Sequence, residues 1–287
     1  MNSILISTEC VADLQTSILE SNDIEVIYYD IKTKNGIFRD ATEIDSQNVM
    51  EYMENGKNKV YSVVPTANGY KNYFDKHLRD YDEIIHICIS GGVSNAYDNA
   101  MLARAKLGMD GNRVFVVDSR HLSSGQALLT LEAVRCKGEG MCSKEIVAHL
   151  KVYIPGIATS FLANNADYLF YNGKVKESVM KLCRKLHAHP VLTMVNGKLT
   201  VKKIYFGNYD RAAKKYIRKV IGNPKEILRE YGFLTYAGCS VEMLDTVKET
   251  LSTIVEFDNF FIQQASATVS CNCGPKTFGI LFVRKTL

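Results

Sequence analysis

The sequence IIHICISGGVSNAY, residues 84–97, joins an apolar stretch to a short turn and the start of a helical pattern. The apolar part is typical of a buried strand, and Gly91 and Gly92 mark a turn where a ligand can approach the main chain closely. Ser94 stands where the helical pattern opens, as an N-cap would. Because the first N–H groups of a helix lack partners and the helix dipole is positive there, this segment predicts an anion-binding site.

Strand-like and helical patterns alternate on both sides of this segment. We expect strands at residues 3–7, 25–31, 60–64, 83–89 and 113–118, and helices at 11–19, 46–54, 66–78, 94–107 and 123–135. Such alternation predicts a parallel sheet covered by helices on both faces, with ligands beyond the carboxyl ends of its strands. Several hydroxyl side chains fall at these predicted ends, which we expect to meet in one crevice: Ser62, Ser90, Ser94, Ser119, Ser123 and Ser124.

A second α/β domain is expected to begin near residue 155. Asn196-Gly197 between two apolar stretches is a strong hairpin signal. Further strands are predicted at residues 157–161, 190–194, 199–204, 234–237, 260–268 and 280–284, with helices at 143–150, 211–221 and 241–255. Hairpin and strand–helix units together predict a mixed sheet, so we expect an N-terminal domain at 1–154 and a C-terminal domain at 155–287.

Composition excludes several classes of protein. The chain has 287 residues, a net charge of +4, and no basic tract interleaved with aromatic residues, so we expect no nucleic-acid partner. No apolar run approaches the roughly 18 residues of a membrane span, and the first residues predict a strand rather than a signal peptide. The eight cysteines are therefore expected to be free thiols in a monomeric cytoplasmic protein.

The motifs of nucleotide binding and hydrolysis are missing. Neither G-x-x-x-x-G-K-[ST] nor G-x-G-x-x-G occurs, which argues against a nucleoside triphosphate ligand. Ser119 precedes His121 closely, but there is no G-x-S-x-G, and Asp118 is expected to order its own turn. A serine-dependent enzyme that uses Ser94 or Ser119 near His121 on an acyl or other small carboxylate substrate stays the alternative hypothesis.

Metal-binding patterns are incomplete. Cys271-Asn272-Cys273 lacks a second ligand pair, and His187 and His189 lack a third ligand. His86 lies in an apolar strand, where a hydrogen-bonded core histidine is expected. We therefore expect no metal site.

Six segments together resemble the DegV family of bacterial fatty-acid-binding proteins. Residues 8–14 are similar to the family's T-D-S-x-A-D-L, 62–66 to T-S-Q-P-S, and 89–97 to I-S-S-x-L-S-G-T-Y. Residues 118–125 are similar to D-S-x-x-x-S-x-G, 168–175 to Y-L followed by G-G-R-I, and 274–279 to the closing G-P with a later glycine. Each motif is weak alone, whereas six in the right order over nearly the whole chain are specific.

The resemblance implies a two-domain α/β fold with a long-chain fatty acid buried between the domains. It places the carboxylate at Ser62 and Ser94, with the acyl chain in an apolar tunnel, no catalytic residue and no cofactor besides the bound fatty acid. Some members present the acyl group to a kinase that phosphorylates the carboxylate. The remaining ligand-binding positions that the resemblance implies are Gly91, Gly92, Asn95, Lys174 and Asn272.

The chain departs from the family pattern at several of these positions. Gly91 replaces a serine, Asn95 and Ala96 replace Gly-Thr, Lys174 replaces an arginine and Asn272 replaces a histidine. Lysine keeps the positive charge without the bidentate fork, and asparagine can donate a hydrogen bond without carrying charge. We therefore expect a retained carboxylate site with an altered set of donors.

Overall fold

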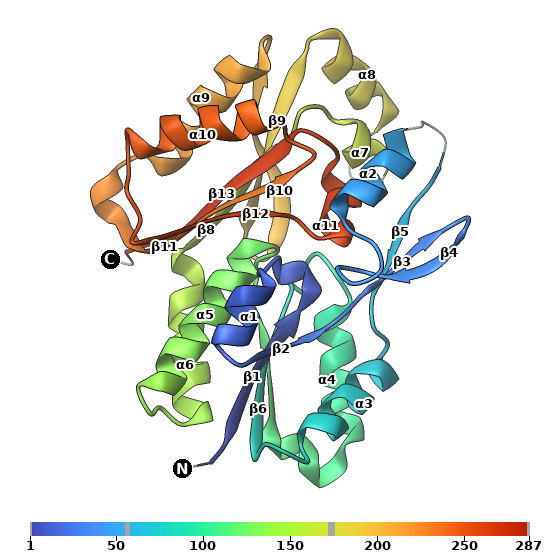
Figure 1. Ribbon diagram of the computed structural model, residues 1–287, viewed down its shortest axis with the longest axis vertical. Coiled ribbons are helices and arrows are strands. Elements are labelled where there is room, and N and C mark those ends of the chain that lie inside the picture. Colours follow the sequence, from blue (N-terminus) through green and yellow to red (C-terminus); the bar gives the residue numbers. More distant parts are fainter. Residues whose placement is uncertain (1, 55–57, 172–175, 286–287) are drawn as a thin grey trace.

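The first half of the chain forms a parallel sheet covered by helices on both faces (Figure 1). The computed structural model describes residues 2–54, 58–171 and 176–285. The strands run in the order β2-β1-β6-β7, with β1 at Ile4–Glu9, β2 at Ile24–Ile27, β6 at Glu83–Cys88 and β7 at Val114–Asp118. The surrounding helices are α1 (Thr16–Ser21), α3 (Ala67–His77), α4 (Ala96–Lys106), α5 (Ser124–Gly138) and α6 (Ser143–Tyr153). The predicted parallel sheet is confirmed.

The core of this half includes a buried histidine. The Nδ1 atom of His86 lies 2.8 Å from the hydroxyl oxygen of Ser7, and its ring packs edge-on against Tyr70 and Phe74. Burial lowers the pKa of His86 to about 3, so the ring is neutral. The predicted core position of His86 is confirmed, but only Nδ1 is hydrogen-bonded, because the buried Nε2 has no hydrogen-bond partner among the described residues.

A separate three-stranded antiparallel sheet corrects two predictions. It has the order β4-β3-β5, with β3 at Asp30–Thr33, β4 at Gly36–Arg39 and β5 at Tyr61–Val63. The single strand predicted at 25–31 is therefore divided between two sheets, and the strand predicted at 60–64 is outside the parallel sheet. The physical reason is local: the tight turn before Gly36 pairs β3 with β4, and β5 then adds to the free edge of β3.

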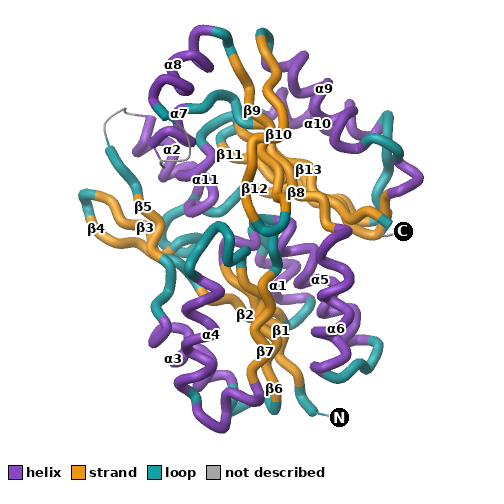
Figure 2. The backbone as a smooth tube through the Cα atoms, turned by 180° about the vertical axis from the view of Figure 1, so that it is seen from behind, coloured by secondary structure: helices purple, strands orange, loops and turns teal. Residues whose placement is uncertain are grey.

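The second half forms a six-stranded mixed sheet in the order β10-β9-β8-β13-β11-β12 (Figure 2). Its strands are β8 (Ile157–Leu162), β9 (Ala188–Val195), β10 (Lys198–Phe206), β11 (Ile227–Ala237), β12 (Asn259–Gln264) and β13 (Thr277–Arg284). Among the described residues of this sheet, β11 and β12 are the only strands that pair in parallel. The helices are α7 (Asp167–Tyr171), α8 (Glu177–Lys185), α9 (Tyr209–Ile221), α10 (Val241–Ser252) and α11 (Ala267–Cys273). The predicted β9–β10 hairpin is confirmed, with positive φ at Asn196 and Gly197.

Two segments differ from their predictions because of local turns. Residues 11–19 contain a 3₁₀ turn over Cys10–Ala12 before α1, and Asp13 between them is left-handed with φ 58°. The strand predicted at 260–268 ends at Gln264, because Ser266 caps α11 by accepting a hydrogen bond from the N–H of Val269 at 3.3 Å.

The two halves share a core. One buried apolar cluster joins side chains of β1, β6 and α5 to Phe161, Phe233 and Leu281 of the mixed sheet. Helix α2 (Ser46–Glu54) also lies beside α11, where the hydroxyls of Ser46 and Ser270 are 2.6 Å apart (Figures 1 and 2). The predicted domain boundary at 154/155 falls in the short turn Ile154–Gly156 and stays a prediction. Across the described ranges, no helix combines the length and apolar character needed to cross a bilayer.

Candidate functional site

A cavity of about 540 Å³ lies between the two halves. This volume is within the range of small-molecule sites in proteins, about 300–1,000 Å³. Both halves contribute to its walls, which are formed by Val11, Tyr29, Ser62, Val64, Ile89, Val93, Ser94, Asn95, Asn99, Leu122, Phe161, Leu192, Leu199, Thr268, Val269, Asn272 and Cys273.

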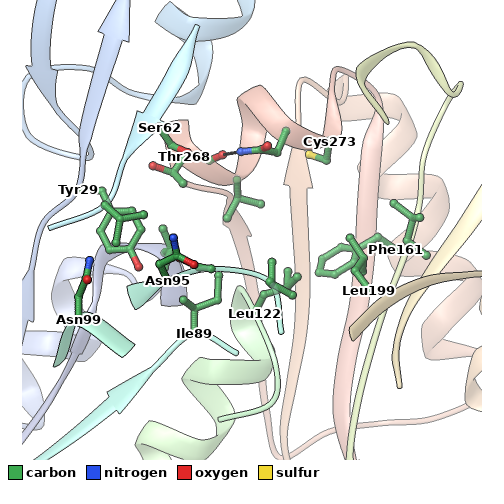
Figure 3. A pocket seen from close by; sticks show the side chains of 17 residues that line it. Tyr29, Ser62, Ile89, Asn95, Asn99, Leu122, Phe161, Leu199, Thr268 and Cys273 are labelled. Carbon is green, nitrogen blue, oxygen red and sulfur yellow. Dashed lines mark hydrogen bonds between the residues drawn. The ribbon is translucent and has the colours of Figure 1, made fainter. Parts of the chain in front are cut away.

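The cavity has a polar end and an apolar end (Figure 3). Tyr29, Ser62, Asn95 and Thr268 gather at one side, which we call the polar end together with the neighbouring Ser94 and Asn99. Leu122, Phe161 and Leu199 lie at the other side, and Leu192 pairs with Phe161 in the sheet, so these four form the apolar end. Such a division suits a molecule with a polar head and a hydrocarbon tail.

The turn between β6 and α4 is fixed by buried hydrogen bonds. The N–H of Ile89 donates to Oε2 of Glu9 at 2.6 Å, and the Ser90 hydroxyl donates to the carbonyl of Gly197 at 2.6 Å. Glu9 also accepts from the hydroxyl of Tyr70, and burial raises its pKa. This turn is thus held on one side by β1 and on the other by the tip of the β9–β10 hairpin.

Gly92 is the point of closest approach between the turn and the hairpin. A Cβ atom at this position would lie 2.3 Å from the carbonyl oxygen of Gly197. The N–H of Gly91 donates to Oδ1 of Asp118 at 3.3 Å, and that carboxylate orders its own turn as predicted by accepting from the N–H of Arg120. Among the described residues, neither Gly91 nor Gly92 lines the cavity, and their role in ligand binding stays a prediction.

Ser94 lines the cavity but does not cap α4. The helix begins at Ala96 with Asn95 as its N-cap residue, so the predicted capping role of Ser94 is wrong. Its hydroxyl oxygen instead accepts a hydrogen bond from the N–H of Ala96 at 3.2 Å. With the oxygen accepting from the main chain, the hydroxyl hydrogen of Ser94 is available to donate to an anion in the cavity.

Ser62 reaches the same cavity from an unexpected place. It is the middle residue of β5, opposite Ile31 of β3, and not the end of a strand in the parallel sheet. Alternation along β5 turns Tyr61 and Val63 outward, where they are 56% and 38% exposed, and leaves Ser62 facing the cavity. The structure thus brings Ser62 and Ser94 to one site, although by different backbone geometry.

The other predicted serines are absent from the cavity walls in the described part of the chain. Ser123 donates to Oδ2 of Asp13, and the hydroxyl of Ser124 pairs with that of Thr235. Ser119 donates to the main-chain carbonyl of His121. These hydroxyls form hydrogen bonds within the fold. Sequence position alone does not distinguish such hydroxyls from those of a ligand site.

His121 is not paired with a serine. Its Nδ1 lies 2.9 Å from the hydroxyl of Thr159 and its Nε2 lies 3.1 Å from the carbonyl oxygen of Ile154. Burial lowers the pKa of His121 to about 4. The arrangement predicted by the enzyme alternative, a serine activated by this histidine, is therefore not formed by Ser94 or Ser119.

The residues of the cavity walls with a hydroxyl or amide group include three that were not anticipated from the sequence: Tyr29, Asn99 and Thr268. Tyr29 lies in the stretch 25–31, which predicts a strand. Thr268 is the last residue of the strand predicted at 260–268, whereas the structure places it in α11. Asn272 lines the cavity as expected, with its amide donating to the carbonyl of Thr268 at 2.7 Å. Lys174 lies outside the described residues.

The described residues contain two groups with the side chains of a metal site. Glu9, His86 and Cys88 are one, and their ligand atoms all lie within 4.8 Å of one another; Glu132, Cys136 and His149 are the other. Both oxygens of Glu9 already accept hydrogen bonds from Tyr70 and the Ile89 N–H, and Glu132 is paired with Arg135 at 2.7 Å. These carboxylates are engaged in holding the fold.

Known proteins with similar sequences and structures place the chain in one family. The family model described as uncharacterised protein, DegV family, matches residues 3–285. The chain belongs to the DegV family. A DegV domain-containing protein of Caldanaerobacter subterraneus is 26% identical over 99% of this chain and 100% of its own length, and one of Clostridium acetobutylicum is 25% identical over 99% and 100%.

Solved structures of other family members share the architecture. A DegV family protein from Thermus thermophilus, described by its fatty acid binding, superposes with a TM-score of 0.85 at 20% identity and covers 98% of this chain and 99% of its own. A DegV family protein from Eubacterium eligens loaded with heptadecanoic acid gives 0.85 at 17% identity, over 99% and 100%. At these identities the likeness shows that the fold is the same.

Proposed function

We propose that this protein binds a long-chain fatty acid, with its carboxylate held by Ser62 and Ser94 and its acyl chain at the apolar end of the cavity. The observation that carries the proposal is the cavity between the halves, which has hydroxyls at one end and leucine and phenylalanine side chains at the other. Fatty acids bound to structures of the same fold support it.

The chemistry of the polar end suits a carboxylate. Ser94 has a hydroxyl hydrogen to donate, and the N-terminus of α4 beside it adds a favourable dipole. Among the described residues, the cavity walls carry no cationic side chain. Within this part of the chain, neutral donors would therefore hold the anion.

The first experiment is native mass spectrometry of the protein as purified, followed by titration with hexadecanoate. An added mass equal to a fatty acid, or saturable binding on titration, is the expected result. A protein that carries no acyl chain and binds none would overturn the proposal.

The second experiment tests the two serines. Removing donors to a buried carboxylate costs about 1–3 kcal/mol each, so Ser62→Ala with Ser94→Ala should weaken hexadecanoate binding at least tenfold. The matched control is Ser17→Ala, because Ser17 is exposed on α1 and is not one of the residues that line the cavity. Unchanged affinity in the double variant would remove these serines from the site.

We further propose that the bound acid is carried to a partner, such as a fatty-acid kinase that phosphorylates the carboxylate. The support is the resemblance to family members that work in this way. The loaded protein, mixed with a purified fatty-acid kinase and ATP, should yield acyl phosphate, whereas the kinase with free acid should yield much less. Equal yields would exclude presentation to that kinase.

A further inference from the structure

The ring of Phe161 rests on a glycine of the neighbouring strand. Phe161 of β8 lies directly opposite Gly279 of β13 in the antiparallel register. A Cβ atom at Gly279 would lie 2.4 Å from Cδ1 and 2.7 Å from Cε1 of the Phe161 ring. One edge of the ring therefore occupies the space that a side chain on this glycine would fill.

The cavity ends at this ring, on the side opposite the polar end (Figure 3). Leu192, opposite Phe161 on β9, lines the cavity, whereas no described residue of β11 or β13 does. Thr235 follows Gly279 in the same row of the sheet, and its hydroxyl pairs with that of Ser124 at the start of α5. Beyond the ring, the sheet is thus covered by packed protein.

The space along β8 is closed as well. Thr159 points to the same face as Phe161, because side chains alternate along a strand, and its Oγ1 lies 2.9 Å from Nδ1 of His121. A Cβ atom at Gly125 of α5 would lie 2.0 Å from that oxygen, so the helix backbone lies directly against the strand. Since protein interiors are close-packed, an acyl tail that reaches the ring has no open path along β8.

We infer that Phe161, seated on Gly279, sets the longest acyl chain that the cavity accepts. The inference rests on the proposed function and names the substrate class as straight-chain acids up to a fixed length. Each methylene that moves from water to an apolar wall gains about fourfold in affinity. For an acid held by its carboxylate at Ser62 and Ser94, that gain stops at the ring, because further methylenes find no room.

The test is competition among saturated acids for the purified protein, measured by native mass spectrometry. The even-numbered acids from dodecanoate to eicosanoate are added as an equimolar mixture, and the amount of each bound acid gives the relative affinities. In the unaltered protein we expect affinity to rise about fourfold per methylene and then to stop rising at one acid of the series. Phe161→Ala removes the ring and should move this stop to a longer acid.

The matched control is Phe206→Ala, because Phe206 is 61% exposed on β10 of the same sheet and is not one of the residues that line the cavity. It should leave the stop at the same acid as in the unaltered protein. Phe161→Leu, a smaller change, should move the stop in the same direction as Phe161→Ala and serves as the test if Phe161→Ala folds poorly.

Each other outcome has a defined meaning. Affinity that keeps rising to eicosanoate in the unaltered protein overturns the inference. An equal loss for every acid in a folded Phe161 variant, with the stop unmoved, also overturns it, since the ring would then be a side wall of the cavity. Both results leave the proposed function standing, whereas an unaltered protein that binds none of the acids overturns the proposed function and the inference together.

Discussion

The polar and the apolar ends of the cavity are built in different ways. At the polar end, Tyr29 follows β2, Ser62 lies on a small separate sheet, Ser94 lies in the β6–α4 turn and Thr268 lies on α11, so four distant segments meet there. At the apolar end, Phe161, Leu192 and Leu199 lie on the neighbouring strands β8, β9 and β10 of one sheet. The difference teaches that the hydrocarbon wall follows from ordinary sheet pairing, whereas the polar end depends on contacts between segments that lie far apart in the sequence.

The largest expected change in fatty-acid affinity comes from a substitution at the apolar end of the cavity. Leu199→Glu would place a carboxylate where a tail is expected, and burying an unpaired charge is costly, so hexadecanoate affinity should fall about 100-fold or more. Octanoate, whose shorter tail reaches less far, should lose much less. Calorimetric titration of both acids checks this, with Leu102→Glu, 55% exposed on α4, as the control. An equal loss for the two acids would mean that Leu199 does not mark the tail end.

A smaller effect is expected at the contact between Gly92, in the turn that carries Ser94, and the tip of the hairpin that carries Leu199. Gly92→Ala puts a methyl group against the carbonyl of Gly197, and overpacking of this kind lowers the free energy of unfolding by about 1–3 kcal/mol. Urea denaturation measures the change. Gly138→Ala is the control, because nothing lies near its Cβ position at the end of α5, and it should be neutral or slightly stabilising. Equal stability of the two variants would contradict the close contact.

The smallest expected effect is a change in the pH dependence of stability. It comes from the carboxyl group of Asp13, which fixes the start of α11 at the polar end. Asp13 accepts hydrogen bonds from the Ser123 hydroxyl and, at 2.8 Å, from the N–H of Ser266, and burial raises its pKa from 3.8 to about 7. Since the folded protein holds this proton more tightly than the unfolded chain does, the contribution of Asp13 to stability is largest at low pH. It is lost as the pH rises from about 4 to about 7.

Asp13→Asn should remove this dependence and gain stability over the unaltered protein as the pH rises through that window. Urea denaturation between about pH 4 and pH 8 measures it. Asp258→Asn, at an exposed position before β12, should keep the original slope. If the free energies of unfolding of Asp13→Asn and of the unaltered protein differ by the same amount at every pH, the raised pKa of Asp13 is contradicted.

The contrast between the two ends of the cavity also explains how much of the fold and of the site could be predicted from the sequence. The strands of the parallel sheet, the β9–β10 hairpin and helix α2 follow from local patterns, and the family follows from six ordered motifs. The position of Ser62 on a separate sheet and the partners of Ser119, Ser123 and Ser124 depend on contacts between distant segments. For Tyr29, in the alternating stretch 25–31, the sequence pattern predicts a strand but not that the residue lines a cavity.

The orientation of the acid is the central claim, and a crystal structure with hexadecanoic acid brominated at its terminal carbon tests it most directly. Anomalous scattering locates the bromine without prior assumptions about the chain. The account predicts the bromine at the apolar end, beside Phe161 and Leu199, with the carboxylate within hydrogen-bond distance of Ser62 and Ser94. Bromine beside Ser62 and Ser94, or an acid bound outside this cavity, would contradict it.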